Sequence, residues 1–397
     1  MLAEVVEPPA EPASVPVVQI ADNSLTSEEV SAGWISLFDG ETLYGWRPAS
    51  QADWKVVDQS IQVTSGEVGL LRTTTQFGDY QLKLDFKAAK GTNSGVFLRT
   101  SPTPDSPTYD CYELNIAPMN NSFPTGSFVG RKKVNVECAD DVWHTFDITM
   151  LGGQMNVKLD GEEVLDFQHE FHLGTGFIGL QHNEGKIQFK NIKLKPLSLQ
   201  SMFNGKDLTG WKLYSKEKYP DMTTKFAVSD EGVLTVKDGP GQLETEKSYG
   251  NFVLQLDAMT HAASLNSGIF FRCIPGDKMM GYESQIQNGF KNGDRTDPED
   301  SGTGAIFRRT KARKVVANDL EWLTKTLIVE GPHIAVWVNG YQVTDWTDKR
   351  KPDENPRRGL RTEAGTIMIQ GHDPTTDFSF RNFKGAESPQ RWPSKRK

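Results

Sequence analysis

The heptapeptide Asn-Ser-Gly-Val-Phe-Leu-Arg at residues 93–99 returns in the second half of the chain as Asn-Ser-Gly-Ile-Phe-Phe-Arg at residues 266–272. A short run of branched and aromatic apolar residues after a glycine is typical of a buried β-strand. The recurrence of this strand predicts that one domain occurs twice in the chain.

The segments on either side of this strand repeat in the same order. The matching pairs are 38–40 with 203–205, 45–46 with 210–211, 77–80 with 249–252, 112–113 with 282–283, 125–126 with 303–304, 160–161 with 339–340, and 189–191 with 380–382. The order is preserved while the spacing grows, so the second copy is predicted to carry longer loops.

Local patterns predict strands throughout. Leu82, Leu84 and Phe86 alternate with polar residues, as in a half-buried strand, and Asn339-Gly340 is a hairpin signal. No segment shows helical periodicity over about 11 residues or more. We therefore predict an all-β protein with two tandem jelly-roll (β-sandwich) domains, at residues 31–197 and 198–386.

The two ends of the chain differ in composition from the rest. Residues 1–30 contain no aromatic residue, Lys or Arg and are rich in Pro and Glu, which predicts a disordered tether. The stretch lacks the basic and apolar regions of a signal peptide, so it is either the mature start of an exported protein or the acidic tail of a cytosolic one. Residues 387–397 are predicted to form a frayed basic tail.

The overall composition disfavours several kinds of partner and site. The 397 residues carry a formal charge of −8, which disfavours nucleic acid as a partner. No apolar run approaches the roughly 20 residues of a transmembrane helix. Cys111, Cys138 and Cys273 form neither a disulfide framework nor a zinc motif.

Together, the repeated motifs resemble the 3-keto-disaccharide hydrolase domain family. The resemblance rests on the Phe-x-Gly-x-x-Leu-x-Gly-Trp opening, the Asn-Ser-Gly-x-Phe-x-Arg strand, the Tyr-Glu strand, the Asn/Asp-Gly hairpin and the closing Phe-Lys/Arg-Asn. It implies a concanavalin A-like jelly roll in each half and cleavage of a glycosidic bond in a sugar oxidised at C3. It also favours an exported protein, periplasmic or extracellular, whose signal has been removed. The sequence requires no cofactor and leaves a divalent cation open.

Period-two alternation places Glu113 and Asn115 on one face of the first Tyr-Glu strand, and Glu283, Gln285 and Gln287 on one face of the second. An acid beside amides can donate and accept the hydrogen bonds that sugar hydroxyls require. We expect these faces to bind carbohydrate; the alternative is a polar row that faces solvent.

Elimination from a 3-keto sugar needs a base at C2, a proton donor for the leaving oxygen and a positive group at the enolate oxygen. The resemblance favours two sets of catalytic candidates, in which base and acid can be exchanged. They are Glu283, His372 and Arg272 in the second copy, and Glu113, His182 and Arg99 in the first. The predicted substrate-binding residues are Gln285, Gln287, Gln370 and Tyr282 in the second copy, and Asn115, Gln181 and Tyr112 in the first.

Several alternatives stay open at this point. The arginines and histidines have structural interpretations, and His182 and His372 differ by one residue in register, so one or both copies can be active. A lectin-like protein without catalysis and an ordinary two-carboxylate glycosidase are the rival functions. For the latter, Asp85 and Asp257 are candidates for a second carboxylate or are exposed edge acids.

The remaining candidates are a basic segment and the tryptophans. The segment Arg308–Lys314 is a solvated face, a site for an anionic sugar, or a contact with the other domain. Trp46, Trp143, Trp211 and Trp322 recur between the copies and are predicted core residues, whereas Trp54, Trp337 and Trp346 do not recur and are candidates for stacking on a sugar ring.

Overall fold

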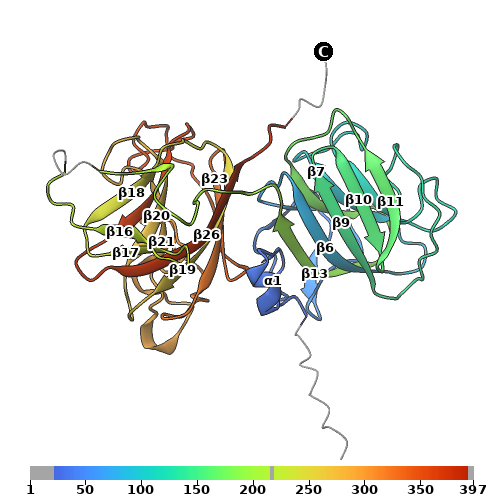
Figure 1. The fold of residues 1–397 in the computed structure, drawn as a ribbon. Helices are drawn as coiled ribbons and strands as arrows, with labels where there is room; N and C mark the ends of the chain where they lie inside the picture. Colours follow the sequence, from blue (N-terminus) through green and yellow to red (C-terminus); the bar gives the residue numbers. More distant parts are fainter. Residues whose placement is uncertain (1–21, 215–218, 392–397) are drawn as a thin grey trace, which may run out of the picture.

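The computed structural model describes residues 22–214 and 219–391, which form two β-sandwiches that lie side by side (Figure 1). Helix in this part of the chain is limited to α1 (Ser27–Ser31) and two turns of 3-10 helix, Lys291–Gly293 and Glu299–Ser301. Among these residues, no helix is long and apolar enough to cross a membrane. The prediction of an all-β protein is confirmed.

The first sandwich packs an eight-stranded sheet on a five-stranded sheet. The large sheet has the order β11 (Glu162–Gln168), β10 (Gln154–Leu159), β9 (His144–Leu151), β6 (Tyr80–Ala88), β13 (Ile187–Pro196), β4 (Ser60–Val63) and β3 (Lys55–Val57), with β1 (Ile35–Ser36) paired to β13. The small sheet has the order β2 (Trp46–Pro48), β5 (Gly69–Thr73), β12 (Phe177–His182), β7 (Ser94–Thr100) and β8 (Tyr112–Ile116).

The second sandwich has the same arrangement. Its large sheet has the order β24 (Tyr341–Thr347), β23 (His333–Val338), β22 (Leu323–Glu330), β19 (Phe252–Thr260), β26 (Asp377–Glu387), β17 (Leu234–Lys237) and β16 (Lys225–Val228), with β14 (Gln200–Ser201) paired to β26. Its small sheet has the order β15 (Trp211–Leu213), β18 (Gly241–Thr245), β25 (Thr366–Gly371), β20 (Ser267–Cys273) and β21 (Tyr282–Ile286).

Each core lies between the two sheets of its sandwich because every second residue of a strand points inward. Along β6, for example, Tyr80, Leu82, Leu84 and Phe86 are fully buried, and the residues between them are only half-buried. The other face of each five-stranded sheet is the face on which the candidate site residues lie.

Part of the segment that was predicted to be a disordered tether packs against the first sandwich. A capping box joins Thr26 and Glu29 at the start of α1, and Glu29 also pairs with Lys193 of β13. The side chain of Asn23 accepts from the backbone N–H of Asn191 at 2.8 Å. The prediction of a tether up to Val30 is therefore wrong from Asp22 onward, and residues 1–21 lie outside the described part.

The C-terminal segment also packs against the first sandwich. Arg391 donates to the carbonyls of Arg99 and Thr175 at 2.9 Å and to the carbonyl of Asp110 at 2.8 Å. The prediction of a frayed tail is wrong for residues 387–391, since three backbone carbonyls hold Arg391. Residues 392–397 lie outside the described part.

Side chains that do not recur between the two copies join the two sandwiches. Trp337 of β23 is 1% exposed, belongs to the hydrophobic cluster of the first sandwich, and donates through Nε1 to the carbonyl of Ser36. Its predicted role in sugar stacking is therefore wrong. Arg313 lies between the rings of Tyr44 and Tyr341 and pairs with Asp39 at 2.8 Å, so part of the basic segment is a contact between domains.

Candidate active sites on the five-stranded sheets

The glutamate of each Tyr-Glu strand lies on the outer face of its five-stranded sheet. Glu113 of β8 and Glu283 of β21 point away from the core, whereas Tyr112 and Tyr282 beside them belong to the two core clusters. The structure thus places both acids on the outer face that the period-two pattern predicted. Both are still largely covered, at 9% and 8% exposed.

A glycine on the neighbouring strand makes room for each acid. Gly95 is opposite Asn115 in the ladder, and Gly268 is opposite Gln285. A Cβ atom on Gly268 would lie 2.7 Å from Oε1 of Glu283, and one on Gly95 would lie 3.5 Å from Cγ of Glu113. The glycine of the Asn-Ser-Gly motif therefore lets the Glu283 carboxylate lie against the sheet.

Burial changes the acidity of both carboxyl groups. It raises the pKa of Glu113 to about 7 and that of Glu283 to about 7, because a charged carboxylate loses hydration in the covered face. At Glu283 the positive charges of Arg357, Lys325 and Arg308 oppose this rise. A carboxylate that titrates near neutral pH is suited to proton transfer.

Around Glu113 the partners are amides. Nε2 of Gln181 donates to Oε1 of Glu113 at 3.2 Å, whereas Oε1 of Gln181 is buried without a partner among the described residues. Asn115 uses its Nδ2 to donate to the carbonyl of Phe123. The carbonyl oxygen of Gln181 is therefore an acceptor that no described residue uses.

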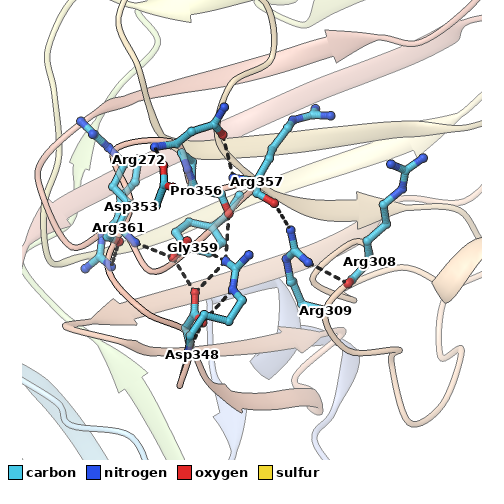
Figure 2. A network of polar contacts seen from close by, with 12 residues as sticks. Arg272, Arg308, Arg309, Asp348, Asp353, Pro356, Arg357, Gly359 and Arg361 are labelled. Atoms are coloured by element: carbon cyan, nitrogen blue, oxygen red, sulfur yellow. Dashed lines mark hydrogen bonds and ion pairs between the residues drawn. The ribbon is translucent and has the colours of Figure 1, made fainter.

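Around Glu283 the surroundings are cationic. A pocket of about 70 Å³ is lined by Glu283, Phe307, Arg308, Pro356 and Arg357. Figure 2 shows how Arg309 donates to the carbonyls of Arg308 and Arg357 and so ties the two loops together. Within the described residues, neither the Arg308 nor the Arg357 guanidinium group is in an ion pair with a carboxylate.

A buried lysine lies behind Glu283. Lys325 of β22 is 2% exposed, and its Nζ donates to the carbonyls of Ser284 and Gln285 at 2.9 Å each. Burial lowers its pKa to about 7. In the first sandwich Phe146 takes this place, since Leu84 faces Phe146 in the ladder as Leu256 faces Lys325.

The amides of the second site are held by loops. Gln285 donates to Oδ2 of Asp300 at 2.9 Å, and Gln370 donates to the sulfur of Met279 at 3.4 Å. The Oε1 atoms of Gln285 and Gln370 lack a partner among the described residues. Gln287 accepts from the N–H of Gly289, which fixes its own loop, so it lies at the edge of the site.

Comparison with known proteins identifies the family of this fold. The 3-keto-alpha-glucoside-1,2-lyase-like domain matches residues 33–195 and again residues 198–384. The chain belongs to this family. The two matched segments contain the two candidate sites.

Individual relatives are more distant. A 3-keto-disaccharide hydrolase of Bacteroides thetaiotaomicron is 31% identical over 77 residues, which cover 16% of this chain and only 27% of that protein. Two solved structures of presumed glycosyl hydrolases from Parabacteroides distasonis are 22% and 26% identical, with TM-scores of 0.41 and 0.37. They cover 45% and 48% of this chain, and 100% and 99% of their own lengths.

The structure does not bring Arg99 or Arg272 to the candidate sites. Both side chains are fully buried and act as clamps for loops. Arg99 donates to the carbonyls of Gly78, Gly152 and Leu173, and Arg272 donates to those of Gly250, Gly331 and Arg361. Arg99 also pairs with the carboxylate of Asp79 at 2.8 Å, and Arg272 donates to Oδ1 of Asn251 at 3.0 Å. Their predicted contact with an enolate oxygen is therefore wrong, because both guanidinium groups are buried and already bound to loop carbonyls and to these side chains.

The histidines are also separate from the glutamates. His182 is 4% exposed and follows Gln181 by one residue, so it points to the face opposite Glu113. His372 lies beyond the end of β25, is exposed, and pairs with Asp373 at 2.7 Å. It follows Met368, which is level with Glu283 across the sheet, by four residues or about 13 Å of strand. The predicted acid–base pairs with the histidines are not assembled.

Other predicted site residues have structural roles. The hydroxyl groups of Tyr112 and Tyr282 point into the sandwiches and bond His169 and Asp348, so their prediction as sugar ligands is wrong. Asp85 and Asp257 bond Asn191 and Asn382, which have positive φ angles at the irregular positions of β13 and β26. They stabilise these strands on the far sheet and supply no second carboxylate to either site.

The tryptophan predictions are right only in part. Trp46 and Trp211 are buried in the cores as predicted. Trp143 and Trp322 are half-buried beneath Lys190 and Arg381 on the outside of the large sheets, so they are not core residues. Trp54 packs against the first core, whereas Trp346 lines a cavity between the sandwiches.

Sequence reasoning missed the cations of the second site. Arg308 was within a basic segment singled out by its charge, but nothing in the sequence placed that segment beside Glu283. Arg357 is in a loop of the second copy, and Lys325 is a charged residue at an alternating core position of β22. No group of three His, Cys, Asp or Glu residues that could hold a metal ion occurs in the described part, and the cation prediction stays open.

Proposed function

We propose that this protein cleaves the glycosidic bond of a 3-keto-glycoside by elimination followed by hydration, and that Glu283 is the base. The observation that carries the proposal is the buried Glu283 carboxyl group, with a pKa of about 7, beside a pocket lined by two guanidinium groups that form no ion pair with any described residue. Membership of the 3-keto-alpha-glucoside-1,2-lyase-like family supports the substrate class.

The proposed reaction starts at C2 of the oxidised sugar. Glu283 accepts the C2 proton, and the electrons of the C–H bond form an enolate with the C3 carbonyl. The enolate then re-forms the C3 carbonyl and a C1–C2 double bond as the C1–O bond breaks. The departing oxygen takes a proton, after which water adds across the double bond, with oxygen at C1 and a proton at C2.

The pocket supplies the charge that this intermediate needs. Arg308 and Arg357 replace Arg272 in the role of stabilising the negative oxygen, because they line the pocket while Arg272 is inside the protein. The protonated Glu283 can return its proton to the leaving oxygen, so that the mechanism requires no histidine.

The first copy has a different balance of groups. Glu113 has the same raised pKa, but its partner is Gln181, and the place of Lys325 is taken by Phe146. We propose that this copy binds sugar through the Glu113–Gln181 pair and contributes less to catalysis.

A pair of matched substitutions tests this assignment. Glu283→Gln keeps the shape and hydrogen bonding of the side chain but removes the base, so we expect turnover of a 3-keto-disaccharide to fall by about 100-fold or more. Glu113→Gln removes one binding contact, so we expect a change of only severalfold. Folded Glu283→Gln protein with activity within about threefold of wild type would exclude Glu283 as the base, and loss of activity in Glu113→Gln alone would assign catalysis to the first copy.

A further inference from the structure

A second, larger cavity lies between the two sandwiches, away from Glu283. Its volume is about 550 Å³, within the range of roughly 300–1,000 Å³ that is usual for small-molecule sites. The first sandwich contributes Arg47, Arg72 and Phe177, and the second contributes Glu330, His333 and Trp346. The walls therefore combine aromatic surface, cations and hydrogen-bonding groups from both domains.

Two arginines concentrate positive charge on the first wall. Arg47 of β2 and Arg72 of β5 face each other in the ladder, on the side of the sheet opposite the core residues Trp46 and Leu71. Burial, and then the charge of Arg47, lower the pKa of Arg72. Among the described residues neither arginine is in an ion pair, and the Arg72 guanidinium lies 4.3 Å from the centre of the Phe177 ring. The first wall therefore carries two guanidinium groups that no carboxylate of a described residue pairs with.

The acids of the second wall do not neutralise these arginines. Asp345 bonds His333 at 3.1 Å and the hydroxyl of Thr74 at 2.9 Å, so its carboxylate is already bound. Glu330 is 7% exposed, and its Oε1 is buried without a partner among the described residues. Burial raises the pKa of Glu330 to about 7, so this carboxyl group carries less negative charge near neutral pH than an exposed glutamate does.

The corresponding place in the second sandwich is not a site of this kind. There Lys212 and Glu244 face each other, in the positions of Arg47 and Arg72. Glu244 is 1% exposed and accepts from Thr366 and from the N–H of Gly276, whose loop covers it. The two arginines are therefore a feature of the junction and not of the repeated fold.

We propose that this cavity binds an acidic sugar unit, namely a uronate. Its carboxylate binds the Arg47–Arg72 pair, and the apolar face of its ring packs on the aromatic side chains of the cavity. The site is independent of the proposed turnover at Glu283, because it uses none of the residues of that pocket.

Calorimetric titration of the full chain tests the proposal with three probes at one ionic strength. The probes are cellobiouronic acid (glucuronate linked to glucose), cellobiose and sodium sulfate. We expect cellobiouronic acid to bind at least about tenfold more tightly than cellobiose, and more tightly than sulfate. Equal binding of the two disaccharides would overturn the proposal, as would sulfate binding as tight as that of the uronate.

Substitutions locate the binding in the cavity. Arg72→Gln is expected to weaken binding of cellobiouronic acid by about tenfold or more, whereas Lys212→Gln, at the position that matches Arg47 in the other sandwich, leaves it unchanged. Arg47→Gln, at an exposed side chain, is expected to act in the same direction as Arg72→Gln and serves if the latter does not fold. Unchanged affinity in folded Arg47→Gln and Arg72→Gln proteins would contradict the assignment.

Discussion

At the scale of single residues, the decisive feature is a carboxylate that is covered but not paired. Glu283 has no ion pair among the described residues, and its pKa rises because burial outweighs the nearby cations. The proposed base is active only when ionised. We therefore expect kcat/KM for a 3-keto-disaccharide to rise with pH up to about 7 and then to level off. A profile that is flat between about pH 5 and pH 8 would contradict this assignment.

The same pKa predicts how stability depends on pH. The folded protein holds the Glu283 proton more tightly than the unfolded chain does, so this residue makes the wild type less stable as pH rises from about 4.5 to about 7. Glu283→Gln lacks this dependence, so the variant should gain stability relative to wild type over that window, by up to roughly 3 kcal/mol. Urea unfolding at pH 5 and pH 8 measures the gain. If the variant and the wild type differ in stability by the same amount at both pH values, the pKa of Glu283 is not raised.

Residue patterns predicted the glutamates better than their partners. Period-two alternation was sufficient to place Glu113 and Glu283 on the outer face, because it requires only that the segment forms a strand. The roles of Arg99 and Arg272 could not be predicted, because each lies near the end of an apolar strand and its partners are groups of loops distant in sequence. The prediction for His182 was wrong because neighbouring residues of a strand point to opposite faces. Gln181 lies on the face of Glu113, so His182 lies on the other face.

At the scale of elements, the two sandwiches differ in what lies beneath the Tyr-Glu strand. β22 places Lys325 under β21, where β9 places Phe146 under β8. Lys325 is a positioning residue that acts on Glu283 through its charge, because its Nζ donates to the backbone carbonyls of Ser284 and Gln285.

Replacement of this lysine gives a test at the element scale. Lys325→Met keeps the volume and removes the charge that lowers the pKa of Glu283, so the rise of kcat/KM should move to higher pH. Phe146→Met is the matched control: it should cost about 1 kcal/mol of stability without moving the profile. Equal profiles in wild type and folded Lys325→Met protein would show that the lysine is merely structural.

At the scale of the whole molecule, the repeat predicted two domains but not their packing. Several contacts between the sandwiches depend on a side chain without a counterpart in the other copy, namely Trp337, Arg313 or Arg391. Comparison of the copies therefore predicts the core that they share, but not the residues at the junction between the two sandwiches. The ends were misjudged for the same reason, because composition does not show that α1 and Arg391 pack against the first sandwich.

The junction is expected to make the two sandwiches unfold together. Trp337→Ala removes a fully buried ring from the hydrophobic cluster of the first sandwich. We therefore expect the free energy of unfolding to fall by about 3–5 kcal/mol and one thermal transition to separate into two. Trp322→Ala, at a half-buried ring outside the cores, should cost clearly less. Calorimetry that shows two transitions in wild type, unchanged in Trp337→Ala, would mean that the domains are not coupled.

The central claim is that cleavage proceeds by loss of the proton at C2. The direct measurement is turnover of a 3-keto-disaccharide in deuterium oxide, with NMR analysis of the released 3-keto sugar and with enzyme-free and Glu283→Gln samples as controls. The account predicts deuterium at C2 of the product, dependent on Glu283, and no cleavage of the unoxidised disaccharide. Release of the sugar with its original hydrogen at C2, or equal cleavage of the unoxidised disaccharide, would contradict it.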